Sequence, residues 1–222
     1  MPAVCFDLDG VLIHTMPMHA AAWEETLKAR GLRVSRRSIY EWEGESGTVT
    51  ARRLLRRHGR DVSDHAIAEL LRDKERRFKR LAGRVRVDPP LETALAALSR
   101  RSVPFGLVTG TSSREVHRVV SRALLRAFRI VITGDCVRRG KPHPEPYRRA
   151  FHALGVQPAQ AIVVENAPYG IRSARRASAG LVVALASSLP SRFLRDAHII
   201  VGSVEQLCEL LDRLTRPARQ AI

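Results

Sequence analysis

The sequence is poor in the residues and segments that mark secreted, disulfide-bonded and membrane proteins. Three cysteines stand far apart in 222 residues, with no CxxC pair and no disulfide spacing, which is typical of a reducing compartment. No apolar run approaches the roughly 18 residues of a membrane span, and the first residues lack the pattern of a signal peptide. We therefore expect a cytoplasmic protein without a membrane partner.

Lysine and aromatic residues are also scarce. Only four of the 38 Lys and Arg residues are lysine, and aromatic residues make up 5% of the chain, although the formal net charge is +16. Nucleic-acid binders gather basic residues in one patch and add aromatic side chains for stacking. Here the arginines are spread over all predicted helices, which indicates solvated helix faces, so no nucleic-acid partner is expected. A positive field of this size would still attract anionic substrates.

Apolar runs and helical patterns alternate in the second part of the chain. With an opening strand before Asp7, this alternation predicts an α/β fold, a doubly wound, mostly parallel Rossmann-like sheet. Ligands of such sheets bind beyond the carboxyl ends of the strands. The predicted strands span residues 105–110, 129–134, 161–166, 180–186 and 198–203, and the predicted helices span residues 113–127, 144–154, 168–178 and 204–214.

A wholly helical pattern interrupts this alternation near the start of the chain. Glycines end two of its predicted helices, and a Ser-Asp pair begins the longest one. We interpret residues 16–86 as a helical cap domain inserted into a core domain made of residues 1–15 and 87–222. The hinges are expected near Thr15 and within residues 84–90.

Two carboxylates stand at the end of the first predicted strand, in the run CFDLDGVL. Asp7 and Asp9 lie two residues apart, so in an extended strand their side chains face the same way. An ionised Asp inside a buried strand is costly unless something compensates its charge. The pair therefore predicts a metal site or a nucleophile with its proton donor; a solvated strand end with an Asp-Gly turn is the alternative.

Polar groups also follow three later strands. Thr109 and Gly110 precede a helix start whose free amides would hold an oxyanion, although plain strand punctuation would give the same pattern. Lys141 lies in RGKPHPEPY, where three prolines fix the backbone and would hold the ammonium in place. Glu165 and Asn166 follow an apolar run and supply two oxygen donors. A surface turn and an acidic helix N-cap are the alternatives for the last two stretches.

Together, these four stretches resemble, in order and spacing, the four motifs of the haloacid dehalogenase (HAD) superfamily of phosphohydrolases. The counterparts of those motifs here are DLDGVL, Thr109 with Gly110, Lys141 in GKPHPEPY, and Glu165 with Asn166. The helical insertion occupies the place of the cap in the β-phosphoglucomutase-like and phosphoglycolate phosphatase-like branch. The resemblance covers essentially the whole chain.

The resemblance implies a phosphoric monoester hydrolase in which Asp7 is the nucleophile and Asp9 donates and accepts protons. It also implies Mg2+ as cofactor, with Thr109 and Lys141 as further catalytic residues. The implied metal ligands are Asp7, the backbone carbonyl of Asp9, Glu165 and Asn166. The implied phosphoryl-binding groups are Thr109 and the backbone amides of Leu8, Asp9 and Gly110.

Two positions depart from the pattern of the resembled branch. Position 166 is commonly Asp there, so Asn166 predicts weaker Mg2+ binding, and Asn166→Asp is expected to tighten it. His14 stands where an acidic residue is usual, and the sequence offers no account of it.

The cap loop EWEGESGT is expected to set the choice of substrate. Mutase relatives place basic residues here to hold a second phosphate, whereas this chain has Glu43, Glu45 and Gly47, which favours a monophosphate hydrolase. His19, near the hinge, is a further substrate-binding candidate. We predict a phosphatase of a small sugar or polyol phosphate, acting as a monomer or weak dimer. A β-phosphoglucomutase-like mutase and a non-catalytic polyanion-binding protein stay open as alternatives.

Overall fold

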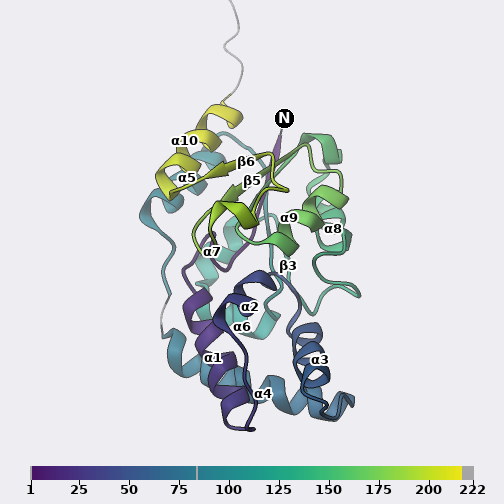
Figure 1. Ribbon diagram of the computed structural model, residues 1–222. Helices are drawn as coiled ribbons and strands as arrows, with labels where there is room; N and C mark the ends of the chain where they lie inside the picture. The colour runs from purple at the N-terminus through teal and green to yellow at the C-terminus, as the bar shows by residue number, and fades with distance from the viewer. Residues whose placement is uncertain (1, 84, 217–222) are drawn as a thin grey trace, which may run out of the picture.

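The computed structural model describes residues 2–83 and 85–216 and contains a six-stranded sheet (Figure 1). The strand order β3-β2-β1-β4-β5-β6 places the first strand in the middle, so the chain builds outward to each side of it. All of these pairings are parallel, which confirms the predicted doubly wound fold. The strands are β1 (Ala3–Phe6), β2 (Phe105–Val108), β3 (Ile130–Ile132), β4 (Ala161–Glu165), β5 (Leu181–Leu185) and β6 (Ile199–Val201).

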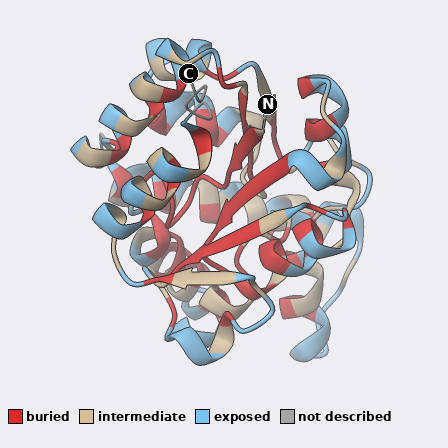
Figure 2. Ribbon diagram, turned by 90° about the horizontal axis from the view of Figure 1, so that it is seen from above, coloured by how far each residue is buried: buried red, intermediate tan, exposed pale blue. Residues whose placement is uncertain are grey.

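The central strand is apolar on both faces because helices cover both sides of the sheet. Val4 and Phe6 pack into one hydrophobic cluster, and Ala3 and Cys5 pack into another, as the two-residue period of a strand requires. Figure 2 shows the central strands buried and the exposed residues on the outer sides of the helices.

Helices form the two outer layers of the core. The face that carries Val4 is covered by α5 (Pro89–Arg100), α6 (Ser113–Val119), α7 (Arg122–Ala127) and α10 (Val204–Thr215). The opposite face is covered by α8 (Glu145–Leu154) and α9 (Pro168–Arg176), and short 3-10 turns lie at Pro158–Gln160 and Ser191–Phe193. Within residues 2–83 and 85–216, no helix is long and apolar enough to cross a membrane.

Two parts of the core differ from the sequence-based prediction. The helix predicted over 113–127 is interrupted because Val120 is extended and the Ser121 hydroxyl begins α7 by accepting a hydrogen bond from the Leu124 N–H. Helix α5 is absent from the prediction, although it begins with two prolines directly after Asp88. Proline suits the first turn of a helix, where an N–H would have no partner.

Four helices form the cap and share a hydrophobic core of their own. Trp23, Leu54 and Leu70 are buried among these helices, and α1 and α4 lie side by side (Figure 1). The helical character predicted for the insertion is confirmed where the structure describes it; the division into two domains remains a prediction. The cap helices are α1 (Met16–Lys28), α2 (Arg36–Glu41), α3 (Gly47–Arg57) and α4 (Asp64–Ala82).

The two connections between cap and core touch each other. His14 Nε2, in the first connection, lies 2.9 Å from Asp88 Oδ2, which follows the second. This contact gives His14 a structural role that the sequence did not reveal. Thr15 is the N-cap residue of α1, so the first predicted hinge lies where the chain enters the cap. In the second predicted hinge, Arg84 lies outside the described residues.

Candidate active site

The carboxyl ends of β1, β2 and β4 meet where the strand order reverses, and the predicted catalytic residues converge there. Asp7 follows β1, Thr109 follows β2, and Glu165 ends β4. The loop between β3 and α8 brings Lys141 to the same place, where its ammonium contacts Asp7. The sequence-distant motifs therefore form one site, at the position where open α/β sheets bind ligands.

Lys141 is the centre of a buried network of charges. Its Nζ donates to Asp7 Oδ1 and Glu165 Oε1, both at 2.6 Å, and to the Val108 carbonyl at 2.9 Å. Its side chain is 1% exposed, so three hydrogen bonds replace the water that an ammonium would otherwise bind. The Tyr147 hydroxyl donates to the same Glu165 oxygen at 2.5 Å, which further fixes the Glu165 carboxylate.

Burial and the charge of the partner shift the pKa values of Asp7 and Lys141 in opposite directions. Burial raises the pKa of Asp7 well above its usual range; Lys141 acts against that shift, while Glu165 and Asp9 add to it. For Lys141, burial works to lower the pKa, but the charges of Asp7 and Glu165 outweigh burial and raise it. Lys141 is therefore a permanent cation beside the carboxylate of Asp7.

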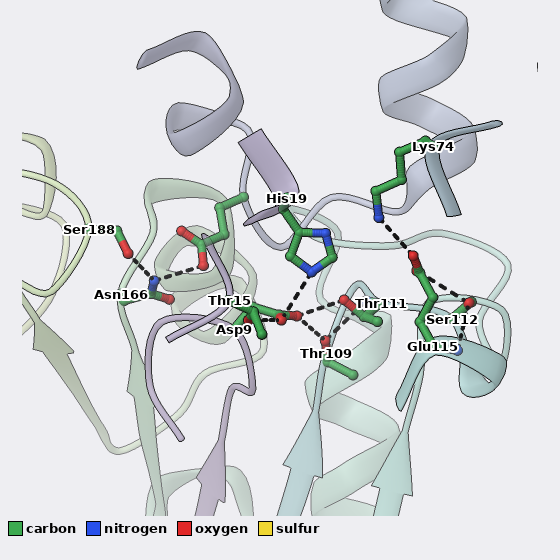
Figure 3. A network of polar contacts seen from close by, with 11 residues as sticks. Asp9, Thr15, His19, Lys74, Thr109, Thr111, Ser112, Glu115, Asn166 and Ser188 are labelled. Carbon is green, nitrogen blue, oxygen red and sulfur yellow. Dashed lines mark hydrogen bonds and ion pairs between the residues drawn. The ribbon is translucent and has the colours of Figure 1, made fainter. Parts of the chain in front are cut away.

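Asp9 lies among polar partners from two segments, the start of α1 and the loop after β2 (Figure 3). Its Oδ2 accepts from Thr111 Oγ1 at 2.6 Å and lies 3.4 Å from Thr109 Oγ1, while its Oδ1 accepts from the Thr15 hydroxyl and lies 3.2 Å from His19 Nε2. Burial works to raise the pKa of Asp9, but His19 and the hydroxyl donors together lower it. The pKa shifts of Asp9 and Asp7, two residues apart, therefore have opposite signs.

Thr111 and Thr15 are polar partners of Asp9 that the sequence analysis did not include among the site residues. Thr111 follows the Thr-Gly motif directly, and its N–H also donates to Thr109 Oγ1 at 3.0 Å. The sequence indicates Thr15 only as a hinge residue. Both residues lie close to the motifs in the sequence, and this proximity is the feature that could have indicated them as site residues. The sequence does not show that both hydroxyls point toward Asp9, because their direction depends on how the loops fold.

The cap loop lies directly on the core motifs. A Cβ at Gly110 would be 2.5 Å from the carbonyl oxygen of Gly44, so only glycine allows this approach. Gly44 itself has a φ of +81°, and a Cβ there would be 3.0 Å from Lys141 Cδ. The cap is therefore closed over the site, and a cavity of about 150 Å³ remains between cap and core.

Of the predicted substrate residues, four line this cavity, namely His19, Glu45, Gly47 and Gly110, and the side chains of His19 and Glu45 already have partners. Glu45 accepts from Arg53 Nη2 at 2.7 Å and from Thr50 Oγ1 at 3.0 Å. His19 stacks on Phe78, with ring centroids 4.0 Å apart, and reaches Asp9. Gly47 begins α3 and also lines the cavity. Leu8 is buried directly between Asp7 and Asp9, and the role of its amide remains a prediction.

A second buried ion pair joins cap to core beside the cavity. Lys74 Nζ, on α4, donates to Glu115 Oε1, on α6, at 2.9 Å, and both side chains are buried (Figure 3). Burial works to raise the pKa of Glu115, but the Lys74 charge outweighs burial and lowers it. Glu115 is not among the site residues expected from the sequence; its N–H also donates to the hydroxyl of Ser112, the N-cap residue of α6, at 3.4 Å.

The donor types at the site fit a magnesium ion. The described residues hold no cluster of three or more His, Cys, Asp or Glu side chains arranged to hold a metal, so a cation here would need mixed donors. Asn166 Oδ1 is buried without a hydrogen-bond partner within the described structure. Glu165 Oε2 accepts a hydrogen bond from the Asn166 N–H at 3.2 Å. Carboxylate, carbonyl and amide oxygens are the ligands that hard divalent cations prefer.

Comparison with known proteins decides the family. The model of the haloacid dehalogenase-like hydrolases matches residues 1–178. The chain belongs to this family. It is 30% identical over 205 residues to validoxylamine A 7'-phosphate phosphatase of Streptomyces hygroscopicus subsp. limoneus, covering 91% of this HAD-like chain and 93% of that protein. It is also 30% identical over 173 residues to fructose-1-phosphate phosphatase YqaB of Escherichia coli, covering 78% and 90%.

A solved structure supports the same fold. The β-phosphoglucomutase of Clostridium difficile superposes with a TM-score of 0.82 at 22% identity, covering 97% of each chain. At that identity the likeness concerns the fold alone. The predictions of the superfamily and of a hydrolase are thus confirmed, and both curated relatives described above are phosphatases by name.

Proposed function

We propose that this HAD-like hydrolase is a Mg2+-dependent phosphatase of a small sugar or polyol phosphate. The observation that carries the proposal is the bridge from Lys141 to Asp7 and Glu165, next to a separately held Asp9. A nucleophile, a fixed cation and a proton-transfer group then stand within one buried site. The names of the two phosphatase relatives support the same reaction class.

Asp7 would attack the phosphorus and form an aspartyl-phosphate, which water then hydrolyses. Repulsion is the obstacle: two like unit charges 4 Å apart cost about 4 kcal/mol at an effective dielectric constant near 20, so a carboxylate facing a phosphate dianion meets about 8 kcal/mol. Lys141 offsets part of this repulsion because its ammonium already touches Asp7. Mg2+, held by Asp7, the Asp9 carbonyl, Glu165 and Asn166, would supply the remaining positive charge when bound.

Asp9 would carry the proton in both half-reactions. It would take up a proton when the negatively charged ester binds beside it, deliver that proton to the departing alkoxide, and later take a proton from the attacking water. Thr111, Thr15 and His19 hold its carboxylate in one orientation, so the proton is delivered to a fixed position. Thr109 and the neighbouring backbone amides would bind the phosphoryl oxygens.

The cavity wall favours hydrolysis of a monophosphate over a mutase reaction. Lys74 lies on this wall, but Glu115 already neutralises it. A mutase needs free positive charge there to hold its second phosphate, so a neutral, hydroxyl-rich substrate body fits better. The carboxylates on the wall, besides Asp7 and Asp9, are Glu43, Glu45, Glu75, Glu115 and Asp135.

Phosphate release from a panel of hexose and hexitol monophosphates, with Mg2+ or with EDTA, tests the proposal. We expect release only with Mg2+, none from Asp7→Asn, and no isomerisation of a hexose 1-phosphate in the presence of a bisphosphate. Isomerisation would favour the mutase. Salt-sensitive RNA binding without hydrolysis of p-nitrophenyl phosphate would favour the non-catalytic alternative.

A further inference from the structure

Two buried oxygens stand without partners at one contact between cap and core. Across the part of the chain that the structure describes, Glu43 Oε2 and Asn166 Oδ1 are the buried side-chain nitrogen or oxygen atoms that lack a hydrogen bond. The two residues are each other's neighbours, because Asn166 Nδ2 donates to Glu43 Oε1 at 2.8 Å. Leaving a buried polar group unpaired is costly, so two such groups side by side indicate a missing ligand.

The hydrogen bonds of Asn166 fix the direction of its side-chain oxygen. Its Nδ2 donates to Glu43 on the cap and also to Ser188 Oγ, at 3.3 Å, on the core (Figure 3). Gly10 allows this packing, since a Cβ there would be 2.0 Å from Nδ2. A flipped amide would place Oδ1 against a Glu43 oxygen, with two acceptors in contact. Glu43 therefore selects the orientation in which Oδ1 is left free.

Glu43 also places a carboxylate beside residue 166, where the resembled branch commonly has Asp and this chain has Asn. Asn166 is neutral, and among residues 2–83 and 85–216 its amide is the one hydrogen-bond donor to the Glu43 carboxylate. The Glu43 side chain is nevertheless buried beside the carboxylates of Asp7, Asp9 and Glu165, and without a bound cation burial and these charges raise its pKa well above the usual range. With Lys141 as the cation within hydrogen-bond reach of Asp7 and Glu165, further positive charge is needed to offset this group of acids.

We propose that Glu43 is a positioning residue of the metal site: it turns the Asn166 oxygen toward Mg2+ and supplies the negative charge that Asn166 lacks. This inference rests on the proposed function, since it assumes that Asn166 binds the metal. Because Glu43 belongs to the cap, the site is complete only when the cap is closed. By linkage, Mg2+ binding then favours closure to the same extent that closure favours Mg2+ binding.

Calorimetric titration of Mg2+ into the metal-free protein, without substrate, measures this role independently of turnover. Glu43→Gln keeps the size of the side chain but removes its charge and its preference for accepting from Asn166. We expect the dissociation constant for Mg2+ to rise about 10- to 100-fold, as for other groups that orient metal ligands. Glu41→Gln is the matched control, because Glu41 ends α2 two residues before Glu43 and accepts a hydrogen bond from Arg37; the affinity of this variant for Mg2+ should equal that of the wild type.

A swap of the two residues separates this role from simple damage to the cap. In Glu43→Gln with Asn166→Asp, the Gln amide can donate to the Asp carboxylate, so the hydrogen bond is reversed and the total charge is restored. We expect Mg2+ affinity to return to within a few-fold of the wild-type value. In hydrogen exchange, Mg2+ should slow exchange of the amides of residues 42–46 in the wild type and the swap, and much less in Glu43→Gln.

Two results would overturn the inference. Wild-type Mg2+ affinity in a folded Glu43→Gln variant would remove Glu43 from the site, and a swap that binds as weakly as Glu43→Gln would show that Glu43 does not act through Asn166. Either result leaves the phosphatase proposal standing if the wild type binds Mg2+. A wild type that binds no Mg2+ and hydrolyses phosphate esters in EDTA would overturn the cofactor itself and this inference with it.

Discussion

Lys141 Nζ lies 2.6 Å from Asp7 Oδ1, although 134 positions separate the two residues in the sequence. The contact places the positive charge of Lys141 beside the carboxylate of Asp7, which has to approach a phosphate dianion. We expect Lys141→Met to lower kcat about 100- to 1000-fold, the usual effect of removing one fixed group that stabilises developing charge. Steady-state phosphate release with Mg2+ measures the loss. Because the substitution leaves Asp7 and Glu165 without their cation, the variant should also unfold at lower denaturant concentration. A folded variant with near-normal kcat would remove Lys141 from the mechanism.

Asp9→Asn should separate the two half-reactions according to the leaving group. A sugar alkoxide needs a proton to depart, so hydrolysis of a sugar phosphate should fall about 100- to 10,000-fold. The p-nitrophenolate ion needs no proton to leave, so the first step with p-nitrophenyl phosphate should survive while the second slows. Rapid-mixing measurements should then record a burst of p-nitrophenolate, about one per active site, followed by slow turnover. Equal losses with both substrates and no burst would argue against the proton role of Asp9.

The buried pair of Lys74 and Glu115 predicts a pH-dependent stability. The pKa of Glu115 is lowered in the folded protein, so the pair stabilises the fold above the unfolded-state pKa of about 4.3 and loses this contribution as the pH falls through the folded-state pKa. Lys74→Met leaves a buried charge unpaired at neutral pH and should cost about 3–5 kcal/mol there. Urea unfolding at neutral pH and below pH 4 should reveal a difference between wild type and variant that shrinks in acid. A difference independent of pH would contradict the electrostatic account.

Asn166→Asp should make the thermal stability of the protein more dependent on Mg2+. The new carboxylate would face Glu43 Oε1, which lies 2.8 Å from the present amide nitrogen, and the two like charges would repel. We expect a lower melting temperature in EDTA and a larger rise on adding Mg2+ than in the wild type. This agrees with the sequence-based expectation of tighter Mg2+ binding. An unchanged response to Mg2+ would place residue 166 outside the coordination sphere.

The strand-end motifs were predictable because each is local. Asp7 and Asp9 share a face through the two-residue period of a strand, and the parallel sheet then brings Thr109 and Glu165 to the same edge. Sequence periodicity also located the cap helices, since Gly and Ser residues mark their ends. It missed the break at Val120 because the apolar pattern continues through Val119 and Val120 while the backbone turns extended.

Contacts between cap and core could not be read from the sequence. Glu43 and Asn166 are 123 positions apart, and Lys74 and Glu115 are 41 apart, so both pairings depend on how the closed cap lies on the sheet. Glu43 illustrates the difference: as a sequence feature it suggested repulsion of a second phosphate, whereas the structure binds it to Asn166.

The nucleophile role of Asp7 can be tested by trapping the covalent intermediate. Borohydride reduces an acyl phosphate but not a free carboxylate, and it converts a phosphorylated Asp into homoserine. The Asp9→Asn variant, quenched during turnover of p-nitrophenyl phosphate with Mg2+, should accumulate the intermediate, and peptide mass spectrometry should then find homoserine at position 7 alone. Homoserine at another position, or an unmodified Asp7 in a variant that shows the burst, would contradict covalent catalysis by Asp7.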